Sequence, residues 1–407
     1  MKKWSSIIIV AVSLQFILQG CNKMVPQAPD STEVIAEPME GLTNAQMMAH
    51  LVGDERFAHV YSQEEGLGPI YIQSSCEGCH VGDGKGHFSS VVVRFGKWEN
   101  GVFDYLDSLG GPQLQGKAIL NYLEEKIPEN SVESFRIPPI ITGLGFLSSV
   151  HDITLLNLAD PFDADGDGIS GRVNYVWPKS AFVQESHHVD SMGYFIGRFG
   201  KKATKITIKE QIVFALKEDI GITSDFDMED PFNVEVGRNT GDDVADPEVS
   251  KNQVEDLVFY LRTLKAPTRR DEDDIDVLAG EEIFKTIGCV DCHIPTLKTG
   301  YSELAPLSEK EFHPYTDLLL HYMPLLSDNF PEESAAPAEW RTAPLWGLGL
   351  AADSQGGIAY YLHDGRATTI QEVVEFHGLG EADAAAKAYK SLTQEKKDQV
   401  IKFLNSL

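Results

Sequence analysis

Two short clusters of cysteine and histidine carry the clearest chemistry in the sequence. Cys76–His80 reads Cys-Glu-Gly-Cys-His, and Cys289–His293 reads Cys-Val-Asp-Cys-His. In this spacing the two thiols can form thioethers to the vinyl groups of a haem, while the adjacent histidine binds the iron. The sequence therefore predicts two c-type haems, attached through Cys76, Cys79, Cys289 and Cys292, with His80 and His293 as proximal iron ligands.

Zinc binding and thiol redox chemistry are the alternatives for these cysteines. Zinc needs four ligands in one place, whereas 213 residues separate the two motifs (289 − 76). A thiol redox pair does not need the histidine that follows both motifs. The chain has five cysteines, and the fifth, Cys21, lies outside both motifs, so no pair is left for a structural disulfide.

The second axial position of each iron decides what a haem can do. A filled position favours electron transfer, whereas an open one admits a small ligand such as hydrogen peroxide. His377 ends a segment of helical pattern and is the favoured second ligand of the His293 haem. Met323 is the competing ligand, because a thioether also binds haem iron. The alternative for His377 is a capping or surface role, since positive charge suits a helix C-terminus.

An internal repeat relates the two halves of the chain and predicts a duplication. Arg136–Gly145 resembles Arg341–Gly349, and Thr207–Ala215 resembles Thr369–His377, in the same order after each haem motif. In the last pair of segments a threonine is followed three positions later by glutamate, which is typical of a capped helix start.

The repeat places Ala215 where the second half has His377. Alanine cannot bind iron, so we expect the His80 haem to have an open face, unless His87 or another histidine folds back onto it. Glu210 and Gln211 lie one turn before Ala215. They are the candidate catalytic groups, because a distal acid or amide can assist cleavage of bound peroxide by proton transfer.

The first residues predict export and a membrane anchor. Lys2 and Lys3 precede the apolar run Ser5–Leu18, which is too short for a stable membrane span. Residues 1–21 end in Leu-Gln-Gly-Cys and look like a lipoprotein signal with Cys21 as the lipidated residue; an ordinary cleaved signal is the alternative. Residues 22–41 are expected to be a tether, and the protein to be a lipoprotein facing the periplasm.

Charge narrows the choice of partners. Lysine and arginine total 34 and aspartate and glutamate 62, which leaves a net charge of −28. Such an acidic chain disfavours nucleic acid as a partner and suits a basic redox protein that donates electrons.

The elements around the motifs predict a mainly α fold of two cytochrome c-like domains, the first enlarged by insertions. Helical patterns precede the second motif at 277–288 and end the chain at 393–407. A further helix is expected to begin with Asp246 as N-cap and Pro247 in its first turn, and to end before Pro267. The charged connector after it sets the domains at residues 42–267 and 268–407.

An acidic loop predicts a calcium site. Asp163, Asp165 and Asp167 alternate and are followed by glycine, as in the first half of an EF-hand loop. Asn174 stands where the full motif has glutamate, so the match is partial and an acidic turn is the alternative. Bound Ca²⁺ would stiffen the insertion beside the first haem.

Together these motifs resemble the bacterial di-haem oxidoreductases, a family that includes peroxidase-like and thiol oxidoreductase-like proteins. The resemblance covers nearly all of the mature chain. It rests on Cys76–Gly84, Asp163–Arg172, Gly197–Gly200, Tyr315–His321, Trp340–Trp346 and Leu362–Ala367. The family is in turn similar to the di-haem cytochrome c peroxidases and to the di-haem enzyme that matures tryptophan tryptophylquinone.

The resemblance implies that the N-terminal haem reacts with peroxide and that the C-terminal haem supplies its electrons. It also implies His377 as the ligand where the peroxidases have methionine. Lys209 stands where they have a catalytic glutamate. The leading interpretation is a di-haem peroxidase-like oxidoreductase acting on hydrogen peroxide or another small oxidant. A non-catalytic electron carrier and an oxidase of a protein or thiol substrate are the alternatives.

Overall fold

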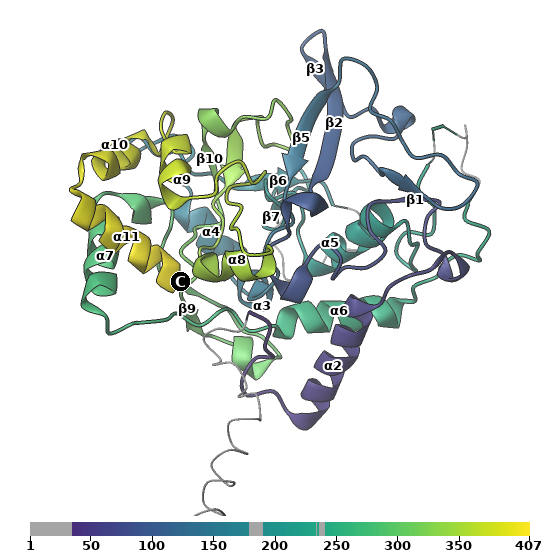
Figure 1. Ribbon diagram of the computed structural model, residues 1–407, viewed down its shortest axis with the longest axis horizontal. Coiled ribbons are helices and arrows are strands. Elements are labelled where there is room, and N and C mark those ends of the chain that lie inside the picture. Colours follow the sequence, from purple (N-terminus) through teal and green to yellow (C-terminus); the bar gives the residue numbers. More distant parts are fainter. Residues whose placement is uncertain (1–34, 179–189, 233, 236–240) are drawn as a thin grey trace, which may run out of the picture. The chain divides into compact units, whose positions relative to one another are not determined.

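The computed structural model describes residues 35–178, 190–232, 234–235 and 241–407, which contain ten α-helices and eleven short strands (Figure 1). The α-helices are α2 (Asn44–Ala58), α3 (Leu144–Ser148), α4 (Asp152–Leu158), α5 (Ile208–Ala215), α6 (Lys251–Thr263), α7 (Ile275–Thr286), α8 (Ala351–Ser354), α9 (Ile370–Phe376), α10 (Asp383–Ser391) and α11 (Gln394–Ser406). The strands are β1 (Ile70–Tyr71), β2 (Val92–Glu99), β3 (Val102–Asp104), β4 (Lys117–Ala118), β5 (Val132–Arg136), β6 (Asn174–Val176), β7 (Phe195–Gly197), β8 (Leu297–Lys298), β9 (Glu311–Phe312), β10 (Leu320–Tyr322) and β11 (Glu339–Arg341).

The fold is mixed α and β, so the expected class of two mainly α, cytochrome c-like domains is wrong. Helix accounts for 34% of the structure and strand for 14%. The strands form a three-stranded sheet in the order β3-β2-β5 and four two-stranded sheets, β1-β4, β6-β7, β8-β9 and β10-β11. All pairs are antiparallel, and β2 and β5 run from Val92 opposite Arg136 to Gly96 opposite Val132. Strands this short give too few alternating positions to be recognised in a sequence.

Two pairs of crossing helices frame the region of the haem motifs (Figure 1). Helix α2 meets α6 at Gly53, where a Cβ atom would lie 2.4 Å from the carbonyl oxygen of Asp256. Helix α7 meets α11 at Gly280, where a Cβ atom would lie 2.0 Å from the carbonyl oxygen of Gln399. Each crossing therefore requires a residue without a side chain.

The same two helix pairs place an aromatic ring beside each motif histidine. Phe57, four residues after Gly53, has its ring centroid 6.2 Å from that of His80, at an interplanar angle of 52°. Phe284, four residues after Gly280, lies 6.2 Å from His293 at 53°. The repeat read from the sequence therefore extends to the local structure around both motifs.

The expected helices near the second motif and at the C-terminus are confirmed as α7 and α11. Helix α6, by contrast, begins later than expected. Its N-cap is Ser250, whose hydroxyl accepts from the Gln253 backbone N–H while the Gln253 side chain accepts from the Ser250 N–H at 2.9 Å. This reciprocal capping box satisfies two helix-terminal donors, so Asp246 and Pro247 lie before the helix.

The described chain begins inside the range expected to be a tether. Met39 is buried, and its backbone N–H donates to the Thr263 carbonyl at 2.8 Å, so this part of the range packs against the end of α6. The expected signal segment and Cys21 lie outside the described residues. No helix among the described residues has both the length and the apolar character that a membrane crossing requires. Residues 35–407 form one unit, and a domain boundary near residue 268 stays a prediction.

Candidate functional site

Both cysteine-histidine motifs open onto one cavity of about 610 Å³. This volume lies within the range of about 300–1,000 Å³ that is usual for cofactor and ligand pockets. The walls come from the motifs themselves, from α5 and α9, and from the two repeated segments around Pro139 and Pro344. Mainly apolar side chains line it, so a large flat apolar cofactor would be shielded from water there.

The two motifs have the same backbone turn. The N–H of His80 donates to the Cys76 carbonyl and that of His293 to the Cys289 carbonyl, each at 3.0 Å. The four thiols are free, and burial is the main cause that raises the pKa of Cys76 and of Cys289 to about 12. Zinc binds thiolates, and no described group of three possible ligand residues that lie together contains a cysteine. Neutral thiols beside a cavity suit thioether formation instead.

Both motif histidines are neutral and available as ligands. Burial lowers the pKa of His80 and of His293 to about 4. The Nδ1–H of His293 donates to the Tyr315 carbonyl at 2.9 Å, which fixes the tautomer and leaves Nε2 with its lone pair. Backbone orientation of the second ring nitrogen is a usual support for a metal-binding histidine.

His377 lies on the cavity wall at the C-terminal end of α9. Its Nδ1–H donates to the Val373 carbonyl at 2.7 Å, so Nε2 is again the nitrogen left with a lone pair, and burial lowers the pKa of the ring. Met323 also lines the cavity, but it packs in a small apolar cluster with Leu326 and Trp340. Both candidate ligands are thus near the cavity, and only His377 has the orienting hydrogen bond typical of a metal ligand.

Helices α5 and α9 both begin with a threonine N-cap and differ in the residue at the C-terminal end. Thr207 caps α5 by accepting from the Glu210 N–H at 3.0 Å, and Thr369 caps α9 by accepting from the Glu372 N–H at 3.2 Å. Ala215 then lines the cavity at the position that corresponds to His377. The geometry therefore agrees with the alignment that paired these two residues.

The two candidate catalytic residues of α5 lie in different places. Glu210 is buried, and its carboxylate accepts from the Ile206 backbone N–H at 2.7 Å, as part of the helix start. Glu210 is not a lining residue, whereas Gln211 is. His87, the alternative ligand, accepts from the Ser89 N–H through Nδ1 at 3.0 Å and does not line the cavity.

The tryptophans also differ in whether they line the cavity. Trp340 and Trp346 are buried and line the cavity, whereas Trp98 and Trp177 are exposed. Trp346 packs against Gly143, where a Cβ atom would lie 2.5 Å from the indole ring. This contact joins the two repeated segments, one from each half of the chain.

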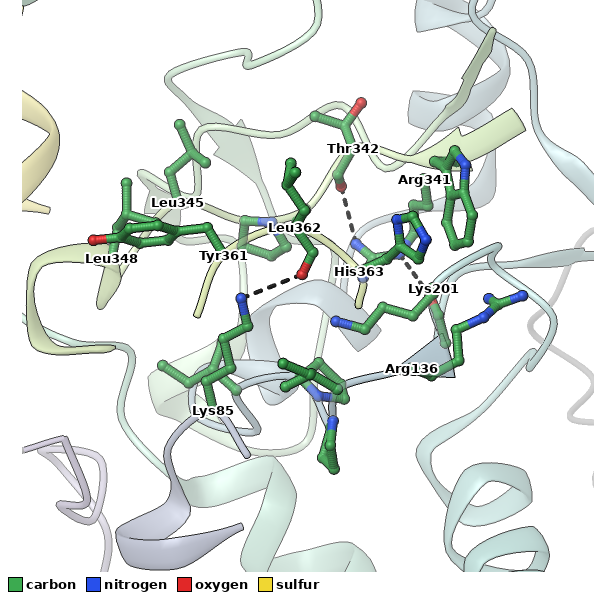
Figure 2. Close-up of a pocket in the computed structure, with 18 of the residues that line it drawn as sticks. Lys85, Arg136, Lys201, Arg341, Thr342, Leu345, Leu348, Tyr361, Leu362 and His363 are labelled. Atoms are coloured by element: carbon green, nitrogen blue, oxygen red, sulfur yellow. Dashed lines mark hydrogen bonds between the residues drawn. The ribbon is translucent and has the colours of Figure 1, made fainter. Parts of the chain in front are cut away.

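Three half-buried cations that line the cavity form no ion pair with a carboxylate among the described residues. They are Lys85, Lys201 and Arg341, and Figure 2 shows the two lysine side chains pointing into the same pocket. Arg341 donates only to backbone carbonyls, those of Gly200 and Thr342, at 3.0 Å each, and Lys85 donates to the Leu362 carbonyl at 3.3 Å.

The lowered pKa values of the two lysines show that their charged forms are disfavoured in the cavity. Burial lowers the pKa of Lys85 to about 8, and burial together with the neighbouring cations lowers that of Lys201 well below its usual range. Unpaired buried charge is costly, so the pocket suits a ligand that brings anionic groups. Haem propionates are such groups, and the sequence reasoning missed these three residues.

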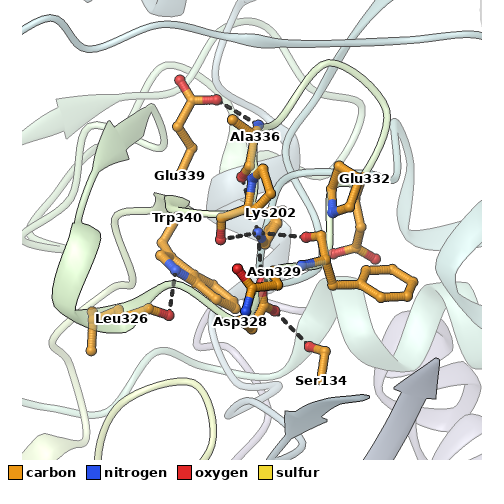
Figure 3. Close-up of polar contacts among 12 residues, drawn as sticks. Ser134, Lys202, Leu326, Asp328, Asn329, Glu332, Ala336, Glu339 and Trp340 are labelled. Carbon is orange, nitrogen blue, oxygen red and sulfur yellow. Dashed lines mark hydrogen bonds and ion pairs between the residues drawn. The ribbon is translucent and has the colours of Figure 1, made fainter. Parts of the chain in front are cut away.

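Lys202, next to Lys201 in the chain, is by contrast fully buried and paired, and it has a structural role. Lys202 donates to the carbonyl oxygens of Phe330, Ala336 and Pro337 at 2.8–3.1 Å and pairs with Asp328 at 3.3 Å (Figure 3). Its ammonium group lies 4.3 Å from the ring centroid of Trp340. This network fixes the wall on which Trp340 stands.

The acidic loop brings its three carboxylates together, with one oxygen of each within 4.8 Å of the others. Asp163 and Asp167 accept from the backbone N–H groups of Gly168 and Ile169 at 3.1 and 2.8 Å. Asp167 lines the cavity. Burial is the main cause that raises the pKa of Asp291, the middle residue of the second motif, and the charge of Asp167 is the next cause. The loop therefore lies beside the second motif, and its expected role beside the first haem stays a prediction.

The donor set defines a class of protein. Two Cys-x-x-Cys-His motifs on one apolar cavity, with buried histidines whose neutral form is favoured and with cations that form no ion pair, suit a protein that holds two haems. The family described as "di-haem oxidoreductase, putative peroxidase" matches residues 121–407, and the chain belongs to it. The matched range contains the second motif and both helices α5 and α9, and begins after the first motif.

No curated relative matches the chain. One solved structure that is similar is Kuenenia stuttgartiensis hydrazine synthase pressurised with xenon. It has 15% identity over 94% of this chain and 96% of that chain, with a TM-score of 0.37.

Proposed function

We propose that the protein is a peroxidase-type oxidoreductase with two unequal c-type haem sites. The observation that carries the proposal is the pairing of Ala215 with His377 on two matching helices of one cavity. When bound, the N-terminal haem would supply the iron that reacts with peroxide, and the C-terminal haem the electrons. The following steps concern what the side chains themselves do.

On the N-terminal side, His80 would hold the haem iron, and the small side chain of Ala215 on the same cavity would leave room for a substrate. Gln211, one turn earlier on α5, is the residue that can donate a hydrogen bond to a peroxide in the cavity. Glu210 holds the helix start instead, so it serves to position Gln211.

The wall beyond this helix is rigid and charged. The Lys205 ammonium group lies 4.1 Å and the Arg94 guanidinium 5.6 Å from the ring centroid of Phe214 on α5. These contacts hold α5 against the cavity.

On the C-terminal side, His293 and His377 would both hold the haem iron, and each ring is oriented through Nδ1 by a backbone carbonyl. A site filled on both faces excludes substrate and favours electron transfer. Trp346 lies on the shared cavity wall and is our candidate for the group between the two sites.

The unpaired cations have a role in this proposal. Lys85, Lys201 and Arg341 would pair with haem propionates, which removes the cost of their burial. They would also favour the reduced state of a nearby haem, because added positive charge opposes oxidation.

Export and anchoring remain part of the proposal on the strength of the signal-like first 21 residues and Cys21. A basic redox protein is the expected electron donor, given the net charge of −28. Metabolic labelling with a fatty acid should mark the wild-type protein and not the Cys21→Ser variant.

One set of spectra tests the peroxidase proposal. The ferric protein is expected to contain a high-spin and a low-spin haem in equal amounts, and cyanide or peroxide should shift only the high-spin bands. Steady-state turnover of peroxide with a reduced donor should accompany these bands. Two low-spin haems in both oxidation states, with no response to cyanide, would make the protein an electron carrier instead.

A further inference from the structure

A second acidic cluster lies away from the EF-hand-like loop, in the segment between α5 and α6. Asp230, Asp246 and Glu248 each offer a carboxylate oxygen within 4.8 Å of the other two. Asp242 is close enough to raise the pKa of both Asp230 and Glu248. Neither the spacing of these residues nor the haem motifs pointed to this group.

The cluster contains carboxylates that are buried and unsatisfied, which solvated acidic patches are not. Asp230 is 8% exposed and Asp242 2% exposed. Asp230 Oδ1, Asp242 Oδ2 and Glu248 Oε1 are all buried without a hydrogen-bond partner. Since buried polar atoms are nearly always paired, these three oxygens indicate a missing positively charged partner.

No cation of the described protein fills that role. Lys217, whose charge acts on Asp230, is paired with Asp227 at 2.9 Å. No described lysine or arginine forms an ion pair with the four carboxylates. The hydroxyl of Thr223 donates to Asp246 at 2.8 Å, and its backbone N–H donates to Glu248 at 2.8 Å. Thr223 thus holds two of the carboxylates facing the same point.

The geometry points to a divalent cation, most simply Ca²⁺, bound by Asp230, Asp246 and Glu248, with Asp242 as a neighbouring buried carboxylate. The available ligands are all oxygen, which suits a hard cation, and they include neither the sulfur nor the nitrogen that zinc or copper prefers. Bound Ca²⁺ would neutralise the crowded charge and satisfy the buried oxygens.

The position of the site gives it a structural consequence. The turn Leu216–Ile220 continues α5 as a π-helix and lines the haem cavity, and Thr223 lies three residues after its end. The Val249 N–H donates to the Thr223 carbonyl at 3.2 Å, one residue before Ser250 caps α6. A cation here ties the end of the α5 segment to the start of α6 and stiffens the N-terminal side of the cavity.

Calcium binding to the mature holoprotein tests the site directly. The Asp163→Asn/Asp165→Asn variant serves as the background, so that the EF-hand-like loop cannot contribute. After chelation, calorimetric titration with Ca²⁺ should reveal one site, and Ca²⁺ at about a hundred times Kd should raise Tm by on the order of 5 °C. Adding Asp230→Asn/Glu248→Gln should abolish both effects, whereas Asp243→Asn, an exposed neighbour of equal charge, should leave them unchanged.

The sign of the stability change separates a cation site from a mere acidic patch. In chelator, Asp230→Asn should raise Tm, because it removes repulsion between unliganded carboxylates. In Ca²⁺ the same change should lower Tm relative to the background, because it removes a ligand. No Ca²⁺ uptake by the background, or equal uptake by the Asp230→Asn/Glu248→Gln variant, would overturn the proposal. Glu248→Gln alone, which keeps the acceptor for Thr223, gives the same comparison if the double variant does not fold.

Discussion

The two haem motifs occupy nearly the same local structure, and a few side chains distinguish them. In each half a glycine allows two helices to cross, a phenylalanine four residues later lies 6.2 Å from the motif histidine, and a threonine-capped helix reaches the cavity. In the N-terminal half this capped helix is α5, and its last residue is Ala215. In the C-terminal half it is α9, and His377 is its C-cap. The proposal of two unequal sites therefore rests on this single position.

The surroundings of the two helices also differ. Helix α9 ends at His377, which a carbonyl of the preceding turn orients. Helix α5 continues into a π-helical turn that ends at Ile220. π-Helical turns are often found at functional sites, and here the turn brings Asp219 and Ile220 to the cavity wall. The N-terminal half, which has alanine at this position, thus has an additional π-helical segment in its cavity wall.

Removal of either pair of thiols should have the largest effect on this comparison. Cys76→Ser/Cys79→Ser should lose one haem and all peroxidase activity, whereas Cys289→Ser/Cys292→Ser should lose one haem but keep cyanide binding at the other. Intact mass and the pyridine haemochrome spectrum give the haem count. Cys21→Ser is the control and should keep both haems; a variant of either motif with two haems would contradict the assignment.

Exchange of the distinguishing residue is the next test. Ala215→His should convert the N-terminal haem to low spin and reduce peroxide turnover to background, because the open position is filled. His377→Ala should produce a second high-spin haem that binds cyanide. Electron paramagnetic resonance of the ferric protein measures both changes. If His377→Ala leaves a low-spin signal while Met323→Ala removes it, Met323 is the ligand and the matched-helix argument fails.

Gln211 and Glu210 offer a smaller and more selective contrast. Gln211→Leu should slow turnover by about a hundredfold, the lower end of what a positioned proton donor contributes. Glu210→Gln keeps an oxygen acceptor for the Ile206 N–H and should retain most activity. Stopped-flow rates with peroxide measure both variants. The reverse ranking would make Glu210 the distal catalytic group.

The sequence was sufficient wherever spacing alone carries the chemistry. The motif histidines, the two capped helices and the pairing of Ala215 with His377 all follow from short patterns that repeat in order. Helices α7 and α11 were also predictable, because their apolar periodicity and glycine or chain end are local signals. The open or filled state of each iron stays a prediction.

The site residues that the sequence did not predict are mainly charged side chains inside the fold. Lysines are mostly exposed, so nothing in the sequence marks Lys85 or Lys201 as cavity residues. Asp246 was interpreted as a helix cap because proline follows it, whereas the structure places it in an acidic cluster with Asp230. The strands were missed because they are short and paired in isolated sheets. Each failure concerns a residue whose role is set by partners distant in the chain.

Lys201 gives the smallest predicted effect and addresses the shared part of the cavity rather than either half. A buried cation stabilises the reduced haem, so Lys201→Met should lower the midpoint potential of at least one haem. At an effective dielectric constant of about 20 the shift is on the order of 50 mV. Spectroelectrochemical titration measures it. Lys97→Met, an exposed lysine paired with Glu99 on β2, is the matched control and should change neither potential.

The pattern of the shifts decides whether the cations serve one site or both. Lys201 lies near Lys85, Arg136 and Arg341, and these residues come from both halves of the chain. If Lys201→Met lowers the midpoint potentials of both haems, the cation cluster acts on both haems alike. The difference between the two haems would then depend on Ala215 and His377. If only one potential falls, the cluster itself helps to make the two sites unequal. An unchanged pair of potentials would mean that Lys201 does not approach either haem.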